Sequence, residues 1–395
     1  MKILIIEDDK LIANIYRNKF ALDGFQAETA PDGDAGLDLV RSFHPDAVLL
    51  DLVLPRVTGF EVMRQLRAEK EFKELPIIVF SNTYLSSMME EAWKAGATKC
   101  LSKANCTPRQ VIDAVRSTLK NNGAAVAAKT GNSHNSSKTG VSLPKSAEDS
   151  DAEFQAKLHR DFTTELPATL GALRTTLQAL IKADNEPGRI KQIQELCRRA
   201  HTLSSNAGIA GATQIALMAD ALEALLKELQ DKPKNINVST LRTVASAVDF
   251  LALLFERGRT PGEPLPPAEV LVVDDEAISR RAVIFALEKA QLKSVSVEDP
   301  IKALDLLSQK KFDLVFLDVD MPHMNGFELC SKLRTLPAYA KTPVVFVTGL
   351  NDLESRAHSS MSGGNDFIAK PFLFIELTVK ALVHVLRARL SAAKK

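Results

Sequence analysis

Two sets of side chains in this sequence have the types and spacing that phosphoryl chemistry requires. Each set combines an acidic pair, a single aspartate, a hydroxyl residue and a lysine. The first is Asp8, Asp9, Asp51, Ser81 and Lys103, and the second is Asp274, Asp275, Asp318, Thr348 and Lys370. Three adjacent carboxylates repel one another unless a cation lies between them, and oxygen ligands of this kind suit Mg²⁺. The lysine and the hydroxyl group can then bind the oxygens of a phosphoryl group, with aspartate as a covalent acceptor.

The two sets indicate that one domain occurs twice. Asp51 and Asp318 are 267 positions apart, and the same offset separates the two hydroxyl residues and the two lysines. The acidic pairs are 266 positions apart, which predicts a single-residue length change between each pair and its central aspartate. An offset held over more than fifty residues indicates a duplicated domain rather than a short-period repeat.

Apolar runs alternate with helical stretches in both copies. The clearest runs are 3–6, 47–50 and 77–80 in the first copy, and 270–273, 314–317, 344–347 and 366–369 in the second. Short, continuous apolar runs separated by helices are typical of a parallel sheet that is covered on both faces. Ligands of such sheets gather at the carboxyl ends of the strands. We therefore expect each set of polar side chains to lie at one rim of an α/β domain.

The segment between the copies has no strand pattern. Helices are expected at 154–182, 188–207, 212–229 and 238–255. In the second of these, apolar residues recur at alternating three- and four-residue spacing, which indicates a buried seam. An all-α four-helix bundle is the expected architecture.

Two segments of unusual composition separate the domains. Residues 121–151 contain few large apolar side chains and predict a flexible linker, whereas 257–267 contain four prolines and predict a stiffer connector. The expected domains are therefore 1–120, 152–256 and 268–390.

Composition argues against several classes of protein. Fifty Lys and Arg against 49 Asp and Glu leave a net charge of +1, which argues against a nucleic-acid surface covering the whole protein. The four cysteines are too few for a disulfide framework in this chain. No uninterrupted apolar stretch approaches the roughly 20 residues of a membrane span, and the apolar run at the N-terminus is too short for a signal peptide. We expect a soluble, cytoplasmic protein.

Each outer segment resembles a response-regulator receiver domain of bacterial two-component systems over nearly its whole length. The sequence DVDMPHMNGFE (318–328) matches that family closely, and LVLPRVTGFE (52–61) matches it more loosely. The resemblance implies a flavodoxin-like, doubly wound parallel sheet with Asp51 and Asp318 as phosphoacceptors. It also implies Mg²⁺ ligands and phosphate-binding residues: Asp8, Asp9, Asp51, the Val53 carbonyl, Ser81 and Lys103 in the first copy, and Asp274, Asp275, Asp318, the Asp320 carbonyl, Thr348 and Lys370 in the second.

The first copy departs from the receiver pattern at two positions. Three residues before the lysine, where the family has an aromatic residue that reports phosphorylation to the outer face, the second copy has Phe367 and the first has Cys100. After the lysine the second copy has Pro371 and the first has Ala104. We therefore expect Phe367 to act as a switch and the second receiver to respond more strongly.

The middle segment resembles a histidine-containing phosphotransfer (HPt) domain, whose motif is AHxLKGxAGxxGA. The sequence from Ala200 to Ala212 matches it except at Ser204, where the family usually has lysine, and at Ser205, where it usually has glycine. The resemblance implies that His201 is a phosphocarrier, and a neutral imidazole is a competent nucleophile near physiological pH. A lone histidine is more often a surface residue, so the motif carries this interpretation.

Together these features predict a phosphorelay protein that moves phosphoryl groups between aspartate and histidine. No segment is left for a kinase ATP site or a DNA-binding domain, so we expect a sensor or hybrid histidine kinase, and other receiver or HPt proteins, as partners. Output is then expected through protein contacts.

Two alternatives remain open at this point. One is a scaffold that is not phosphorylated, which Cys100, Ala104 and Ser204 favour. The other is a Mg²⁺-dependent phosphatase of haloacid dehalogenase type, suggested by Asp318 and Asp320, although the first copy has Val53 at the second of these positions.

Overall fold

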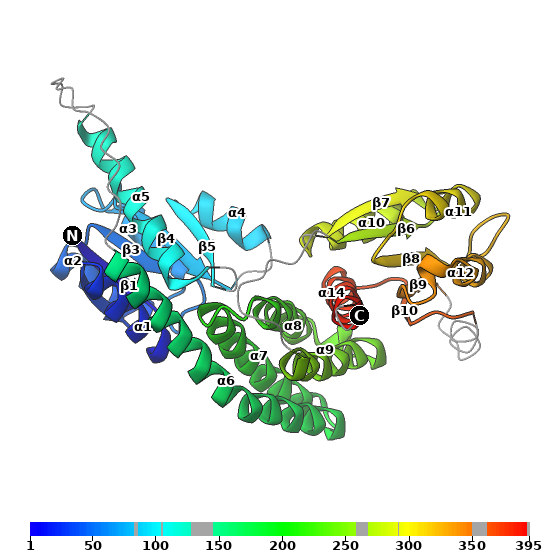
Figure 1. The fold of residues 1–395 in the computed structure, drawn as a ribbon. Coiled ribbons are helices and arrows are strands. Elements are labelled where there is room, and N and C mark those ends of the chain that lie inside the picture. Colours follow the sequence, from blue (N-terminus) through cyan, green and yellow to red (C-terminus); the bar gives the residue numbers. More distant parts are fainter. Residues whose placement is uncertain are drawn as a thin grey trace. The chain divides into compact units, whose positions relative to one another are not determined.

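The structure is a computed structural model of the 395-residue chain (Figure 1). It describes residues 1–82, 86–103, 106–127, 145–257, 268–290, 292–349 and 362–392. Ala104, the proline-rich connector from 258 onward and the linker residues 128–144 lie outside these ranges.

The N-terminal domain is a five-stranded parallel sheet with the strand order β2-β1-β3-β4-β5. Its elements are β1 (Lys2–Ile6), α1 (Lys10–Leu22), β2 (Gln26–Ala30), α2 (Gly33–Phe43), β3 (Ala47–Leu50), α3 (Gly59–Ala68), β4 (Ile77–Ser81), α4 (Ser86–Lys94), β5 (Lys99–Ser102) and α5 (Pro108–Ala127). Helices alternate with strands along the chain, as the apolar runs predicted.

Strand β1 shows how the sheet is buried on both faces. Ile3 and Ile5 pack in one apolar cluster with residues of α1 and α5. Leu4 and Ile6 pack in a second cluster with residues of α2 and α3. Successive side chains of a strand point to opposite faces, so both faces of the sheet need a helical cover. The C-terminal ends of the strands are left open for polar side chains.

The C-terminal domain repeats this topology, with the order β10-β9-β8-β6-β7. Its elements are β6 (Glu269–Val273), α10 (Ala277–Lys289), β7 (Lys293–Val297), α11 (Pro300–Gln309), β8 (Leu314–Asp318), α12 (Gly326–Thr335), a 3₁₀ turn (Pro337–Tyr339), β9 (Val344–Thr348), β10 (Asp366–Ala369) and α14 (Phe374–Ala392).

The offset between the two domains is uniform. Strand β1 begins at Lys2 and β6 at Glu269, a difference of 267, and the other four pairs of strands begin at the same spacing. The predicted single-residue length change is therefore wrong. At this offset the counterparts of Asp274 and Asp275 are Glu7 and Asp8 rather than Asp8 and Asp9.

The middle domain is a four-helix bundle, as predicted. Its helices are α6 (Lys145–Lys182), α7 (Glu186–Ile209), α8 (Thr213–Asp231) and α9 (Val238–Arg257), with a 3₁₀ turn at Pro233–Asn235. The expected seam of α7 is buried, at Ile193, Leu196, Ala200, Leu203 and Ala207. Helices α5 and α6 extend into the segment predicted as a flexible linker, because residues 121–127 and 145–151 are helical.

Helix α9 is long and apolar enough to cross a membrane by length and composition, the one such helix in the described part of the chain. Half of its apolar 18-residue stretch is buried inside the protein. Ser239 and Thr243 on α9 donate hydrogen bonds to Glu376 Oε1 on α14, at 2.6 and 3.0 Å. A core helix of a globular protein passes the same test, so α9 is weak support for a membrane span.

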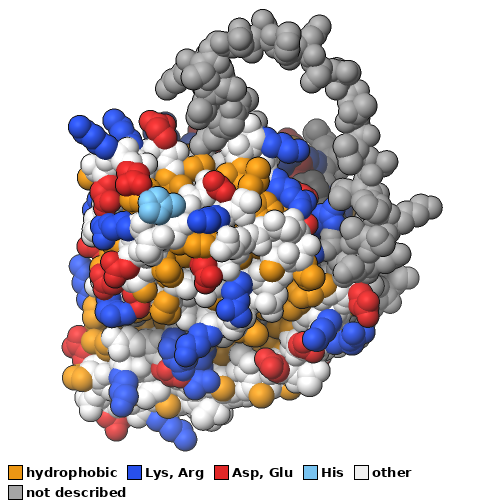
Figure 2. All heavy atoms as spheres, turned by 90° about the vertical axis from the view of Figure 1, so that its left-hand side faces the viewer, with side chains coloured by type: hydrophobic (Ala, Val, Ile, Leu, Met, Phe, Trp, Pro, Cys, Tyr) orange, Lys and Arg blue, Asp and Glu red, His pale blue; other side chains and the backbone are white. Residues whose placement is uncertain are grey.

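Charge is evenly distributed on the face drawn in Figure 2. Basic and acidic side chains are interspersed there, and no large patch of one sign covers it. This agrees with the net charge of +1. Nucleic-acid binding surfaces concentrate positive charge instead.

Candidate functional site

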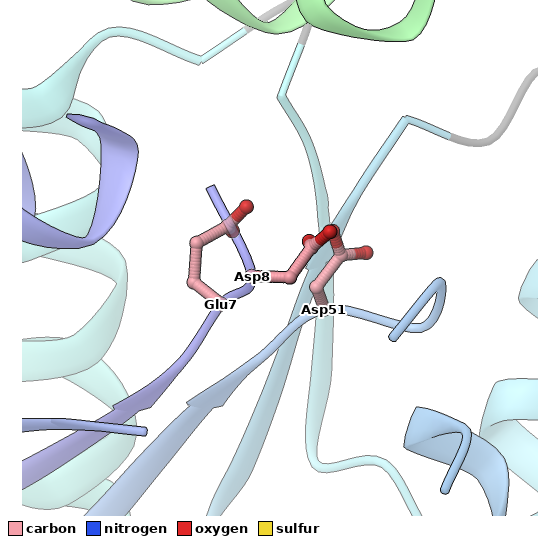
Figure 3. Close-up of side chains that lie close together, drawn as sticks. All are labelled: Glu7, Asp8 and Asp51. Atoms are coloured by element: carbon pink, nitrogen blue, oxygen red, sulfur yellow. The ribbon is translucent and has the colours of Figure 1, made fainter. Parts of the chain in front are cut away.

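Three carboxylates meet at the C-terminal rim of the first sheet (Figure 3). Glu7 and Asp8 follow β1 and Asp51 follows β3, and one ligand oxygen of each lies within 4.8 Å of the others. Glu7 and Asp51 are buried and Asp8 is exposed, so the group is open to solvent on one side. Carboxylate oxygens at this spacing, one of them on an exposed residue, fit the ligand preferences of Mg²⁺.

Asp9 does not lie in this group. Its carboxylate caps the N-terminus of α1 by accepting hydrogen bonds from the Leu11 and Ile12 amides, at 2.8 and 3.3 Å. The position expected for Asp9 is occupied by Glu7, which the sequence analysis missed. The signal was available, because an offset of 267 from Asp274 leads to Glu7.

Lys103 joins the rim from the end of β5. Its Nζ donates hydrogen bonds to Asp51 Oδ2 at 2.6 Å and to Glu7 Oε1 at 2.9 Å, and the side chain is fully buried. The Ser81 hydroxyl donates to Asp51 Oδ1 at 2.6 Å, and the Val53 amide donates to the same oxygen at 3.1 Å. Both oxygens of Asp51 are therefore held by donors that can bind phosphoryl oxygens.

These donors control the charge of Asp51. Burial alone would raise the pKa of its carboxyl, but the Lys103 ammonium and the His201 imidazole oppose this, and the pKa is lowered. Burial raises the pKa of Glu7, and Lys103 offsets only part of that effect. Asp51 is thus the carboxylate kept ionised, as a nucleophile toward phosphorus must be.

The rim of the second sheet has the same plan. Asp274, Asp275 and Asp318 place ligand oxygens within 4.8 Å of one another. Lys370 Nζ donates to Asp274 Oδ2 at 3.2 Å and to Asp318 Oδ2 at 3.1 Å, and Thr348 is buried at the end of β9.

The second rim is looser than the first. The Lys370 side chain is 21% exposed, whereas that of Lys103 is fully buried. Burial and the neighbouring Asp274 raise the pKa of Asp318, and Lys370 offsets this only in part. The loops after β3 and β8 carry Val53, which is 37% exposed, and Asp320, which is exposed.

His201 lies on α7, half-buried, in a compact unit that includes the whole first receiver-like domain and residues 201–220. Its imidazole is near enough to lower the pKa of both Asp8 and Asp51, although burial and Asp51 raise that of Asp8 overall. Next to Ser81, Asn82 Nδ2 donates to Ser205 Oγ at 2.7 Å. The structure therefore brings together Asp51 and His201, which are 150 positions apart in the sequence.

The two departures from the HPt motif have defined surroundings. Ser204 is fully buried and its hydroxyl donates to the Ala216 carbonyl at 3.2 Å. Ser205 is also fully buried and accepts the hydrogen bond from Asn82.

The aromatic position also differs between the two sheets. Phe367 packs against the apolar cluster that contains Phe346, and the Arg242 guanidinium of α9 lies 5.8 Å above its ring. Cys100 packs against the corresponding cluster of the first domain, and burial raises the pKa of its thiol to about 11.

A buried aspartate bound by a lysine, with a hydroxyl residue at the end of a nearby strand, occurs at both rims and is the arrangement of phosphoryl-accepting domains. The model of the response regulator receiver domain family matches residues 3–116 and 270–382, and the Hpt domain model matches 157–252. The chain belongs to the response regulator receiver family, with an Hpt domain between its two receivers. Receiver and Hpt domains are the phosphoryl-accepting and phosphoryl-carrying domains of two-component phosphorelays.

Similar proteins agree with this assignment over parts of the chain. Protein RcaC of Microchaete diplosiphon is 32% identical over 127 residues, which are 32% of this chain and 20% of RcaC. Response regulator MprA of Mycolicibacterium vanbaalenii is 38% identical over 103 residues, 26% of this chain and 44% of MprA. The chain thus spans less than half the length of either relative.

Two similar solved structures each match a part of this chain that has the length of a single receiver. The chemotaxis protein CheY4 of Vibrio cholerae is 31% identical with a TM-score of 0.29, over 30% of this chain and 99% of that one. The receiver domain of a histidine kinase from Syntrophus aciditrophicus is 32% identical with a TM-score of 0.29, over 32% and 93%.

Proposed function

We propose that Asp51 and Asp318 are the phosphoacceptors of the two receivers, that His201 is the phosphocarrier, and that Asp51 and His201 exchange a phosphoryl group within one chain. The observation that carries this proposal is the position of His201, because Asn82, the residue after Ser81, donates hydrogen bonds to the His201 carbonyl oxygen and to Ser205 Oγ on the same helix. Asp51 itself is already bound by Lys103 and Ser81.

The transfer step follows from these positions. A carboxylate oxygen of Asp51 forms a bond to phosphorus while the bond from phosphorus to the His201 ring nitrogen breaks, and its electron pair stays on the imidazole. The Lys103 ammonium, hydrogen-bonded to Asp51 Oδ2 at 2.6 Å, keeps Asp51 ionised for this attack. Lys103 and Ser81 then bind the oxygens of the transferred group. The same groups serve the reverse transfer.

We propose that each rim holds one Mg²⁺. The ligands would be Glu7, Asp8, Asp51 and the Val53 carbonyl in the first receiver, and Asp274, Asp275, Asp318 and the Asp320 carbonyl in the second. A bound ion would neutralise charge on the phosphoryl oxygens. Asp9 is not included because its carboxylate caps α1.

The remaining assignments follow from the domain types. Phosphoryl groups would enter from a sensor or hybrid histidine kinase or from other receiver and HPt proteins, in the cytoplasm, and leave through protein contacts. A pure scaffold would not need a lysine and a hydroxyl group already bound to Asp51. The phosphatase alternative is not favoured, because Val53 stands where that scheme needs an acid.

The test uses the full-length chain with acetyl phosphate and Mg²⁺. Wild type should gain base-labile phosphate on aspartate and base-stable, acid-labile phosphate on His201. His201→Gln should keep the first and lose the second, and the double variant Asp51→Asn, Asp318→Asn should gain no aspartyl phosphate. Undiminished aspartyl phosphate in that double variant would contradict the assignment.

A further inference from the structure

Two sets of contacts hold α6 and α7 against the first receiver. Away from the rim, Ile209 of α7 belongs to the apolar cluster that contains residues of α1 and α5, and Lys19 Nζ lies 5.7 Å over the ring of Phe154 of α6. At the rim, Asn82 contacts the helix that carries His201. The apolar contact can hold the helix in place, but it does not depend on the identity of the residues beside Asp51.

Asn82 joins the acceptor rim to the carrier helix. It directly follows Ser81, which is hydrogen-bonded to Asp51. Its Nδ2 donates to Ser205 Oγ at 2.7 Å and approaches the His201 carbonyl oxygen at 3.4 Å. Ser205 lies four positions after His201, so it sits one helical turn away on the same face. Asn82 therefore joins the turn of α7 that carries His201 to the strand end that carries Ser81.

Asparagine at this position is not explained by the stability of the first receiver. Asn82 is 5% exposed, and its Oδ1 is buried with no hydrogen-bond partner among the described residues. Leaving a buried amide oxygen unpaired costs free energy. The Asn82 side chain therefore lowers the stability of the receiver, and only its hydrogen bond to α7 offsets this loss.

The second receiver has a different residue at the position of Asn82. At the offset of 267 the counterpart of Asn82 is Gly349, which has no side chain that could donate such a hydrogen bond. A Cβ built on Gly349 would meet no atom within 4 Å, so packing does not require glycine there. The two receivers therefore differ at the position that meets the helix beside His201.

We infer that the hydrogen bond between Asn82 and Ser205 is a specificity contact that positions His201 for exchange with Asp51 and not with Asp318. This inference rests on the proposed exchange between Asp51 and His201. Asn82 and Ser205 are positioning residues, because their hydrogen bond joins the receiver to α7.

The experiment measures the rate at which base-stable phosphate appears on His201 in the full-length chain after loading with acetyl phosphate and Mg²⁺. The background is Asp318→Asn, which leaves one loaded receiver. Asn82→Ala and Ser205→Ala should each slow the transfer about three- to tenfold, the loss of one hydrogen bond. Because they remove the same contact, the double variant should be no slower than the slower single variant.

Three controls separate the possible causes. Loading of Asp51 in each variant is measured in a His201→Gln chain, so that an effect on receiver chemistry is subtracted. Gly349→Asn is the matched change in the second receiver, which Asp318→Asn keeps unphosphorylated. It should leave the rate of transfer to His201 unchanged. Asn82→Gly, which gives the first receiver the residue of the second, should slow transfer as much as Asn82→Ala.

The outcomes are distinct. If the Asp318→Asn chain with no further substitution never phosphorylates His201, the proposed exchange itself fails. If it does, and if Asn82→Ala and Ser205→Ala leave the rate unchanged or act additively, the specificity contact is refuted. Thermal unfolding of Ser205→Ala, which removes one buried hydroxyl, shows whether the bundle stays folded; with the fold intact, a slowed rate supports the contact.

Discussion

At the scale of single residues, the two receivers hold their lysines differently. Lys103 is fully buried between Glu7 and Asp51, whereas Lys370 is partly exposed and lies farther from its carboxylates. Removing one partner of a buried ion pair leaves the other charge uncompensated. The lysine of the first receiver should therefore matter more for stability than that of the second.

We predict that Lys103→Met destabilises the first receiver by about 3 kcal/mol, the lower end of the range for breaking a buried pair. Lys370→Met is the matched control and should cost the second receiver less, because water screens its partners. Hydrogen exchange at β1 and β3, compared with β6 and β8, measures the two domains separately in one chain. Equal losses of protection in the two domains would contradict the prediction that the buried lysine contributes more to stability.

The sequence identified the site only in part at this scale. Asp51, Ser81 and Lys103 could be predicted because each ends or follows an apolar strand. Glu7 was missed because two consecutive aspartates look like the better acidic pair, and only the capping hydrogen bonds of Asp9 exclude it from the rim. Asn82 carries no sequence signal, since its role depends on a residue 123 positions away.

At the scale of elements, α14 of the second receiver is buried on two faces. Leu377, Ala381 and Val385 pack in the cluster under the sheet. Leu382 and Leu386 are buried outside that cluster, and Glu376 accepts hydrogen bonds from α9. The helix pair thus places Arg242 of α9 over Phe367, the residue expected to switch. The periodicity of α9 could predict a helix, but not which receiver it contacts.

We predict that the beryllofluoride phosphate mimic changes hydrogen exchange strongly around Phe367 and weakly around Cys100. An aromatic side chain that turns inward vacates a large volume, whereas a thiol does not. Measuring both regions in one full-length chain gives an internal comparison. Protection changes around Cys100 as large as those around Phe367 would show that the missing aromatic does not decide the response.

Arg242 should bias that switch. A contact made in one state alone shifts the equilibrium by its own free energy, and a cation–π contact contributes about 0.5–1 kcal/mol. Arg242→Ala should therefore speed phosphorylation of Asp318 by acetyl phosphate roughly two- to fivefold. The matched control is Arg387→Ala, which removes a similar contact with Phe250 and leaves Phe367 untouched. Equal rates in the two variants would argue against a role for Arg242.

At the scale of the whole molecule, the chain is a duplicated receiver around an Hpt bundle. The duplication, both sheets and the bundle could be predicted because strand and helix periodicities are local properties of the sequence. Contacts between distant segments could not, and in the proposed exchange these contacts select the receiver that serves His201. The first receiver has the buried lysine, the aspartate with the lowered pKa and the asparagine contact; the second has the aromatic side chain of Phe367. This division suits exchange at Asp51 and signalling at Asp318.

The central claim is that Asp51 and His201 exchange phosphate within one chain. The most direct measurement is the rate of His201 phosphorylation in full-length Asp318→Asn and Asp51→Asn variants, loaded with acetyl phosphate and Mg²⁺ over a series of protein concentrations. We predict rapid transfer in Asp318→Asn at a rate independent of concentration, and little transfer in Asp51→Asn. Faster transfer in Asp51→Asn, or a rate in Asp318→Asn proportional to protein concentration, would contradict the account.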